Sequence, residues 1–143
     1  MKSTVSIKIG KQLAIFLRDE PGALAQVCET LAKHKINIDA LATESGGYFG
    51  QRDGETLVRM MVSDPEKALS VLGESGATAV ETEVLMIETK KQPSAMAKIS
   101  ELLAQAKVNI ESIYLSGSAD AKKCLIILRP SNLEKAERAL KDL

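Results

Sequence analysis

The chain has 143 residues, and its 19 basic and 19 acidic side chains give a formal net charge of zero. This balance gives no electrostatic reason to expect nucleic acid or an anionic membrane as a partner, and no apolar run approaches the roughly 20 residues of a membrane span. Hydrophobic residues make up 45% of the sequence, enough for the core of one ordinary domain or two small ones. The N-terminus also lacks the continuous apolar segment of a secretory signal, so we expect a cytoplasmic protein.

The first third of the chain alternates between strand and helix patterns. Residues 4–9 alternate polar and apolar side chains as strands do, and residues 12–17 read as a short apolar strand. A polar break ending in Pro21 and Gly22 then precedes an amphipathic helix. The proline is expected in the first turn of that helix. The predicted buried face of the helix comprises Leu24, Val27, Cys28, Leu31 and Ala32. Strand character returns at residues 36–43.

The next elements follow a glycine-rich loop at residues 45–54. This loop either closes over a ligand as a lid or is an exposed hairpin tip. Residues 56–62 are predicted to form a strand, and Asp64 with Pro65 predicts the N-cap and first position of a second helix. Residues 78–83 alternate as a further strand, which gives the order β-α-β-β-α-β.

The chain also repeats itself. Residues 21–44 align with residues 93–116, and nine of the 24 pairs are identical, more than composition alone produces. The match resumes later at a shorter offset, so the second copy has lost four residues from a loop. In this copy, Ser131 and Glu134 predict a capping box for the last helix.

Each copy predicts a ferredoxin-like βαββαβ domain of the α+β class, with helices on one face of an antiparallel sheet. We place the first domain at residues 1–83 and the second at residues 84–143, and count eight strands in all. The second domain lacks a fourth strand of its own, whereas residues 4–9 are a spare one. The spare strand either completes the second copy or folds back through a type II′ hairpin at Gly10 and Lys11. A frayed terminus is the remaining alternative.

The sequence gives little support for a catalytic site or a metal site. Cys28 and Cys124 have no CxxC spacing and no nearby histidine, so we interpret both as small buried hydrophobes. His34, the single histidine, has no partner residue at a recognisable spacing. No nucleophile with an adjacent base and no phosphate-binding loop is found, so we expect no enzymatic activity, metal or cofactor.

A motif in the first copy has a family resemblance. A strand ends in an acidic residue, a Pro-Gly pair and a helix follow, and Asn-Ile comes about sixteen residues after the proline. These residues are Asp19, Pro21, Gly22, Asn37 and Ile38. A weaker version in the second copy comprises Pro93, Ser94, Asn109 and Ile110. The pattern resembles the ACT domain, a regulatory module of amino-acid metabolism, and in its duplication it resembles the stand-alone tandem ACT proteins. The resemblance implies amino-acid binding at an interface between ACT domains, and a homodimer.

The start of the first helix also suits such a ligand on physical grounds. A helix N-terminus has unpaired N–H groups and a positive dipole end that favour a carboxylate, and Gly22 permits close approach to the backbone. Asp19 can pair with an ammonium group, and Asn37 offers an amide. The predicted ligand-binding residues are Asp19, Pro21, Gly22, Ala23, Leu24, Asn37, Ile38 and Asn109. The alternative is structural: Asp19 caps the helix, Pro-Gly turns the chain, and the asparagines bind loop backbone.

The two copies differ where this ligand would bind. At the positions of Arg18, Asp19 and Glu20 the second copy has two lysines and a glutamine, and a serine replaces Gly22. We therefore expect one amino-acid site per chain, with Asn109 of the second copy as part of its wall. The alternative is that Lys90 and Lys91 form a separate anion site, unless both are merely solvated.

Three functions agree with these observations. The first is a free-standing sensor of a free amino acid. The second is a regulatory subunit that binds a separate catalytic subunit, and the third is a transcription antagonist that acts through protein contacts.

Overall fold

The computed structural model of the chain describes residues 5–45 and 54–143, and their contacts divide into two compact units. We call Lys11–Thr82 the first unit, and Met1–Gly10 with Glu83–Leu143 the second unit. Two long strands, β1 (Ser6–Arg18) and β4 (Thr78–Lys90), contain residues of both units. Residues 5–10 thus group with the second repeat, whereas the sequence-based boundary placed them in a domain of residues 1–83.

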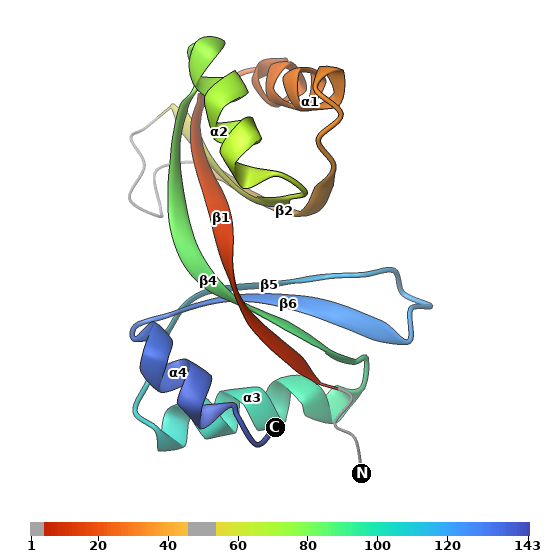
Figure 1. Cartoon of the computed structure of the whole chain (residues 1–143), viewed down its shortest axis with the longest axis vertical. Coiled ribbons are helices and arrows are strands. Elements are labelled where there is room, and N and C mark those ends of the chain that lie inside the picture. Colours follow the sequence, from red (N-terminus) through yellow and green to blue (C-terminus); the bar gives the residue numbers. More distant parts are fainter. Residues whose placement is uncertain (1–4, 46–53) are drawn as a thin grey trace. The chain divides into compact units, whose positions relative to one another are not determined.

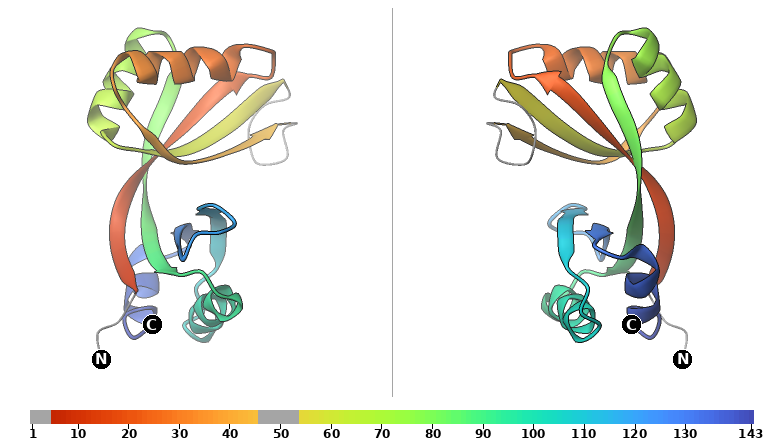
Figure 2. Two further views of the ribbon diagram at one scale, coloured as in Figure 1. Left: turned by 90° about the vertical axis from the view of Figure 1, so that its right-hand side faces the viewer. Right: turned by 90° about the vertical axis from the view of Figure 1, so that its left-hand side faces the viewer.

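The first unit is a sheet with the strand order β2-β3-β1-β4 and two helices (Figure 1). Strand β3 (Glu55–Val62) pairs antiparallel with both β1 and β2 (Ile38–Ser45). Helices α1 (Ala23–Lys33) and α2 (Pro65–Glu74) lie together on one face of these strands, as the views in Figure 2 show. The element order and strand order are those of the predicted ferredoxin-like fold.

The core of the first unit lies between this sheet face and the helices. Alternate residues of the strands face it, among them Leu13 and Ile15 of β1, which are fully buried. From α1, Val27 and Leu31 enter at the spacing of one helical face. The period-two and helical patterns in the sequence therefore predict the faces that pack together.

The second unit has the strand order β5-β6-β4-β1 and carries α3 (Pro93–Gln105) and α4 (Leu133–Ala139). Strand β6 (Lys123–Pro130) pairs antiparallel with β4 and with β5 (Ile110–Ser116). Its core has the same composition of alternating strand residues and one helical face from each helix.

The N-terminal segment completes the second unit, as one of the sequence-based alternatives predicts. Val5 and Ile7 pack against the core of that unit, and β1 is the strand next to β4. The hairpin alternative is wrong, because β1 continues through Gly10 without a turn. A type II′ turn needs positive φ at its first central residue, and Gly10 is not among the described glycines that have it. The frayed terminus is wrong as well, because residues 6–9 belong to β1. The count of eight strands is also wrong: β1 and β4 are each one continuous strand, so the described residues form six.

The helix starts confirm one prediction and correct two. Asp64 caps α2 by accepting a hydrogen bond from Lys67 N–H at 3.1 Å, with Pro65 at the start of the helix, as predicted. Pro21 does not lie in the first turn of α1, since the helix begins at Ala23 after Gly22 as N-cap. The predicted capping box of α4 is also wrong, because the cap is Asn132, whose side chain accepts from Lys135 N–H at 3.0 Å.

The cysteines and the histidine occupy structural positions. Cys124 is buried on β6, as predicted, whereas Cys28 on α1 is only half-buried. His34 is the C-cap of α1, with Nδ1 2.9 Å from the carbonyl oxygen of Thr30.

Candidate functional site

The N-terminus of α1 is open. Its N-cap is Gly22, which has φ of 91° in the left-handed region and no side chain that could cap the helix. The first turn of the helix contains no acidic residue. Ala23 N–H donates to the carbonyl of Glu20, and Gln26 N–H donates to that of Gly22. Among the described residues, the N–H groups of Leu24 and Ala25 have no hydrogen-bond partner. Two free donors at the positive end of a helix dipole favour a bound carboxylate.

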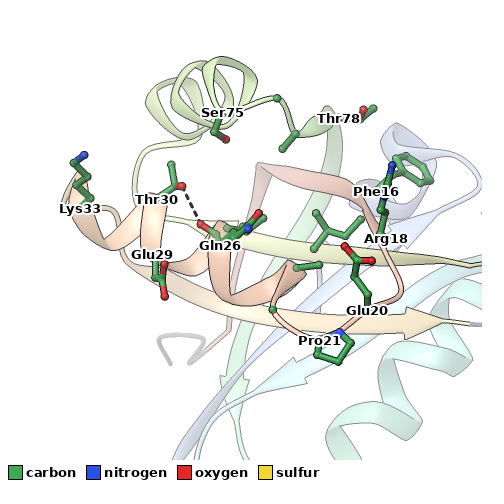
Figure 3. Close-up of a pocket in the computed structure, with 16 residues that line it drawn as sticks. Phe16, Arg18, Glu20, Pro21, Gln26, Glu29, Thr30, Lys33, Ser75 and Thr78 are labelled. Carbon is green, nitrogen blue, oxygen red and sulfur yellow. Dashed lines mark hydrogen bonds between the residues drawn. The ribbon is translucent and has the colours of Figure 1, made fainter.

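A pocket of about 730 Å³ lies beside this helix start, within the first unit. Its walls are the end of β1, the loop that enters α1, one face of α1, and the loop at Ser75–Thr78 that follows α2. Leu17, Val27 and Ala77 supply apolar surface. Figure 3 shows Arg18 and Glu20 toward one end of the pocket and Lys33 toward the other, with Ser75 on the α2 side.

The charges at the β1 end of the pocket are complementary to a zwitterion. Arg18 and Glu20 both line the pocket, and neither forms an ion pair among the described residues. A guanidinium group together with the free N–H groups of α1 suits a carboxylate, and a carboxylate suits an ammonium group. An α-amino acid carries both groups on one carbon atom.

Of the residues predicted from the sequence, Pro21, Gly22 and Ala23 line this pocket. Asp19 does not. It is exposed, its N–H donates to the Gly54 carbonyl at 2.7 Å, and its carboxylate accepts from the Thr56 hydroxyl at 3.2 Å. Asp19 is therefore bound to the start of β3, and Glu20, the next residue, is the acid that lines the pocket.

Three further predicted residues have packing or backbone roles in the first unit. Leu24 and Ile38 pack against its core. Asn37 lies beyond the C-terminal end of α1, and eleven residues of helix, about 16 Å, separate that end from Gly22. The Asn37 N–H donates to the Ser63 hydroxyl at 3.0 Å, and its carbonyl accepts from Ser63 N–H at 2.9 Å. The amide side chain is not part of this pairing and does not line the pocket.

Asn109 forms the same pair of hydrogen bonds in the second unit. Its N–H donates to the Ser131 hydroxyl at 2.9 Å, and Ser131 N–H donates to its carbonyl at 2.8 Å. This recurrence accounts for the serine present in both copies, whose hydroxyl accepts the hydrogen bond, but not for the asparagine, which takes part through its backbone alone. A ligand contact by either asparagine stays a prediction.

Sequence reasoning missed Arg18 and Glu20, although both flank the motif that it singled out, and it missed the loop Ser75–Thr78. That loop begins more than forty residues after the end of α1 and has no chemical signal of its own. The predicted lid, residues 45–54, falls mostly outside the described residues. Within residues 5–45 and 54–143, no helix is long and apolar enough to cross a membrane.

The two units each have four strands in the ferredoxin-like order and two helices, and in the second unit the N-terminal part of β1 takes the place of the last strand. The chain is therefore a pair of ferredoxin-like domains. The family model described as "ACT domain pair" matches residues 5–142, so the chain belongs to the ACT family. A search of curated proteins found no match.

Solved structures have the same fold. Protein BT0572 from Bacteroides thetaiotaomicron is 32% identical, with a TM-score of 0.83 over 95% of this chain and 89% of that one. The regulatory subunit of aspartate kinase from Thermus thermophilus, in a ligand-free form, is 20% identical, with a TM-score of 0.66 over 98% of both chains. Its counterpart from Thermus flavus is 22% identical, with a TM-score of 0.63 over 98% of this chain and 96% of that one.

Proposed function

We propose that this protein is a regulatory amino-acid sensor that binds one free α-amino acid in the pocket at the start of α1. The observation that carries the proposal is the conjunction of Arg18, Glu20 and the open N-terminus of α1 at one end of one pocket. In this arrangement Arg18 and the N–H groups of Leu24 and Ala25 hold the carboxylate. Glu20 holds the ammonium group, and the rest of the pocket accepts the side chain.

Membership in the ACT family supports a regulatory role, in agreement with what the motif resemblance implies. We expect ligand binding to change assembly or partner contacts, with no chemical step on the ligand. We still expect a homodimer located in the cytoplasm. Analytical ultracentrifugation measures the oligomeric state.

The test is a thermal-shift screen of the twenty amino acids followed by titration calorimetry. A ligand at about 100 times its dissociation constant raises the free energy of unfolding by about 2.7 kcal/mol, which the screen detects readily. Glu20→Gln should then weaken binding at least tenfold, because the charge-assisted bond to the ammonium group is lost. Glu83→Gln is the matched control, since Glu83 is an exposed acid on β4 that does not line the pocket. Equal affinity in the two variants would show that the ligand binds elsewhere.

A separate catalytic subunit is the second candidate partner. Two of the similar structures are named regulatory subunits of aspartate kinase, which makes that role concrete for those proteins. Affinity purification from the native host separates the two functions. A catalytic protein recovered in equal amount and retained through gel filtration would favour the subunit role, and recovery of the chain alone would favour the free-standing sensor. A recovered transcription regulator would favour the antagonist.

A further inference from the structure

The chain makes a tight turn where β1 ends. Glu20 N–H donates to the carbonyl oxygen of Arg18 at 2.9 Å, and this hydrogen bond closes a three-residue γ-turn with Asp19 at its centre. Asp19 is not among the described residues with positive φ, so the turn is of the inverse type that is common at the ends of strands. The turn brings Arg18 and Glu20 close together on either side of Asp19. Both outer residues line the pocket, and the central one does not (Figure 3).

Two contacts hold the centre of this turn at the start of β3. The Asp19 N–H group donates to the Gly54 carbonyl at 2.7 Å, and Asp19 Oδ1 accepts from the Thr56 hydroxyl at 3.2 Å. The backbone and the side chain of Asp19 are thus both bound to the same short segment. Because Asp19 is the middle residue of the turn, these bonds also restrict the residues on each side of it.

The backbone contact recurs in the second unit, but the side-chain contact does not. Lys91, the counterpart of Asp19, donates its N–H to the Lys122 carbonyl at 2.9 Å. The register of the strands makes Cys124 the counterpart of Thr56, and a thiol is only a weak donor. The Lys91 ammonium group donates instead to two loop carbonyls. Both members of the side-chain pair are therefore replaced in the second copy.

The γ-turn also differs between the two units. Among the described residues, no hydrogen bond joins the N–H of Gln92, the counterpart of Glu20, to the Lys90 carbonyl. The backbone contact at the centre is present in both units, so it does not by itself produce the turn. The turn is found in the unit that has the contact between Asp19 and Thr56.

We propose that Asp19 and Thr56 form a positioning pair, which holds the γ-turn so that Arg18 and Glu20 are presented together to the pocket. The proposal rests on the proposed function, in which these two side chains hold the carboxylate and the ammonium group of one amino acid. Those groups are attached to one carbon atom, so their two partners must be close together when the amino acid binds. A turn that is already ordered avoids the loss of conformational entropy on binding. Asp19 then acts on the amino acid only through its neighbours.

Four variants separate positioning from direct contact. Asp19→Ala and Thr56→Val each remove the hydrogen bond, and each should weaken binding of the amino acid found in the screen by about three- to tenfold. Their double variant should bind no more weakly than either single one, because both remove the same contact. Asp19→Asn keeps an acceptor and Thr56→Ser keeps the donor, so both should bind as wild type does. Thr43→Val is the matched control, since Thr43 is an exposed threonine on β2 that does not line the pocket.

Amide hydrogen exchange at Glu20 measures the turn without any amino acid present. The protection factor of this N–H should fall in Asp19→Ala and Thr56→Val and keep its wild-type value in Asp19→Asn and Thr56→Ser. Equal protection in all variants would overturn the proposal, as would unchanged affinity in Asp19→Ala. An affinity loss in Asp19→Asn as large as in Asp19→Ala would also overturn it, because the Asp19 charge would then contact the amino acid directly. If no amino acid binds wild type, the proposed function fails, and lower protection in Asp19→Ala and Thr56→Val still supports the pair as the support of the turn.

Discussion

A side chain at Gly22 can have two separate effects: it can strain the left-handed backbone there, and it can block the ligand site at the start of α1. Gly22 has φ of 91°, and a Cβ atom added to it meets no atom within 4 Å. The Cβ atom of Gly22→Val therefore has open space, and we expect the cost in stability to come from the left-handed backbone. That cost is about 1–2 kcal/mol for an L-residue and is partly offset by about 0.5–1 kcal/mol through the reduced freedom of the unfolded chain.

The expected net loss is about 1 kcal/mol, which lowers the melting temperature of a chain of this size by about 2–4 °C. Gly22→Asn should cost less, because asparagine adopts the left-handed region more readily than other side chains. Gly73→Ala is the control. Gly73 also has open space around it but has no positive φ and lies inside α2, so alanine should raise stability by up to about 1 kcal/mol.

The ligand response gives the second measurement. Both Gly22→Val and Gly22→Asn add a side chain at the entrance to α1, so both should weaken amino-acid binding in calorimetry even though they differ in stability. Loss of binding in the valine variant alone would assign the effect to strain. A valine variant as stable as wild type, or less stable than the asparagine variant by several kcal/mol, would refute the strain argument.

Further predictions concern the helix ends and the paired serines. Lys35 has φ of 59° after α1, so Lys35→Gly should raise stability by up to about 1 kcal/mol, measured by the melting temperature. Asn132→Ala should destabilise the protein by about 1 kcal/mol in urea unfolding, since it removes the cap of α4, and no change would contradict the cap. Ser63→Ala should cost about 0.5–1.5 kcal/mol, whereas Asn37→Ala should leave both stability and ligand affinity unchanged because only the Asn37 backbone is bound. Reduced ligand affinity in Asn37→Ala would restore that side chain to the site.

Most of the fold could be predicted from the sequence because the repeat doubles each local signal. The apolar run at residues 12–17 predicts a strand and the helical face through Val27 and Leu31 predicts a buried face, and residues of both pack together in one core. The continuous β1 could not be predicted from the turn signal at Gly10, which is a permissive residue and not an obligatory turn. Val5 and Ile7 pack against the core of the second unit, and Leu13, Ile15 and Leu17 against the core of the first, whereas Ile9 and Lys11 between them are exposed. The core-facing residues on both sides of Gly10 are thus odd-numbered, and this shared period is the better signal.

The candidate site could be predicted only in part. The Pro-Gly pair identifies the entrance to α1 because its chemistry is local. The wall at Ser75–Thr78 depends on how α2 packs beside α1, which no short segment encodes. Glu20 was passed over for Asp19 because both acids lie in the loop after β1, where strand alternation no longer predicts which side chain lines the pocket.

The repeat itself distinguishes residues that fold the chain from those that bind. Features retained in both copies are structural: the asparagine and serine pair joins the start of one strand to the end of the next, and a lysine of positive φ follows the first helix of each copy. The residues that differ lie at the end of the first strand and the start of the helix. There Arg18 and Glu20 align with Lys90 and Gln92 of the second copy. Folding requirements act equally on both copies, so they preserve identity at offset positions. A ligand that binds only one copy does not maintain the identity of the aligned residues in the other copy. The positions at which the two repeats differ therefore indicate the ligand-binding surface better than the positions at which they agree.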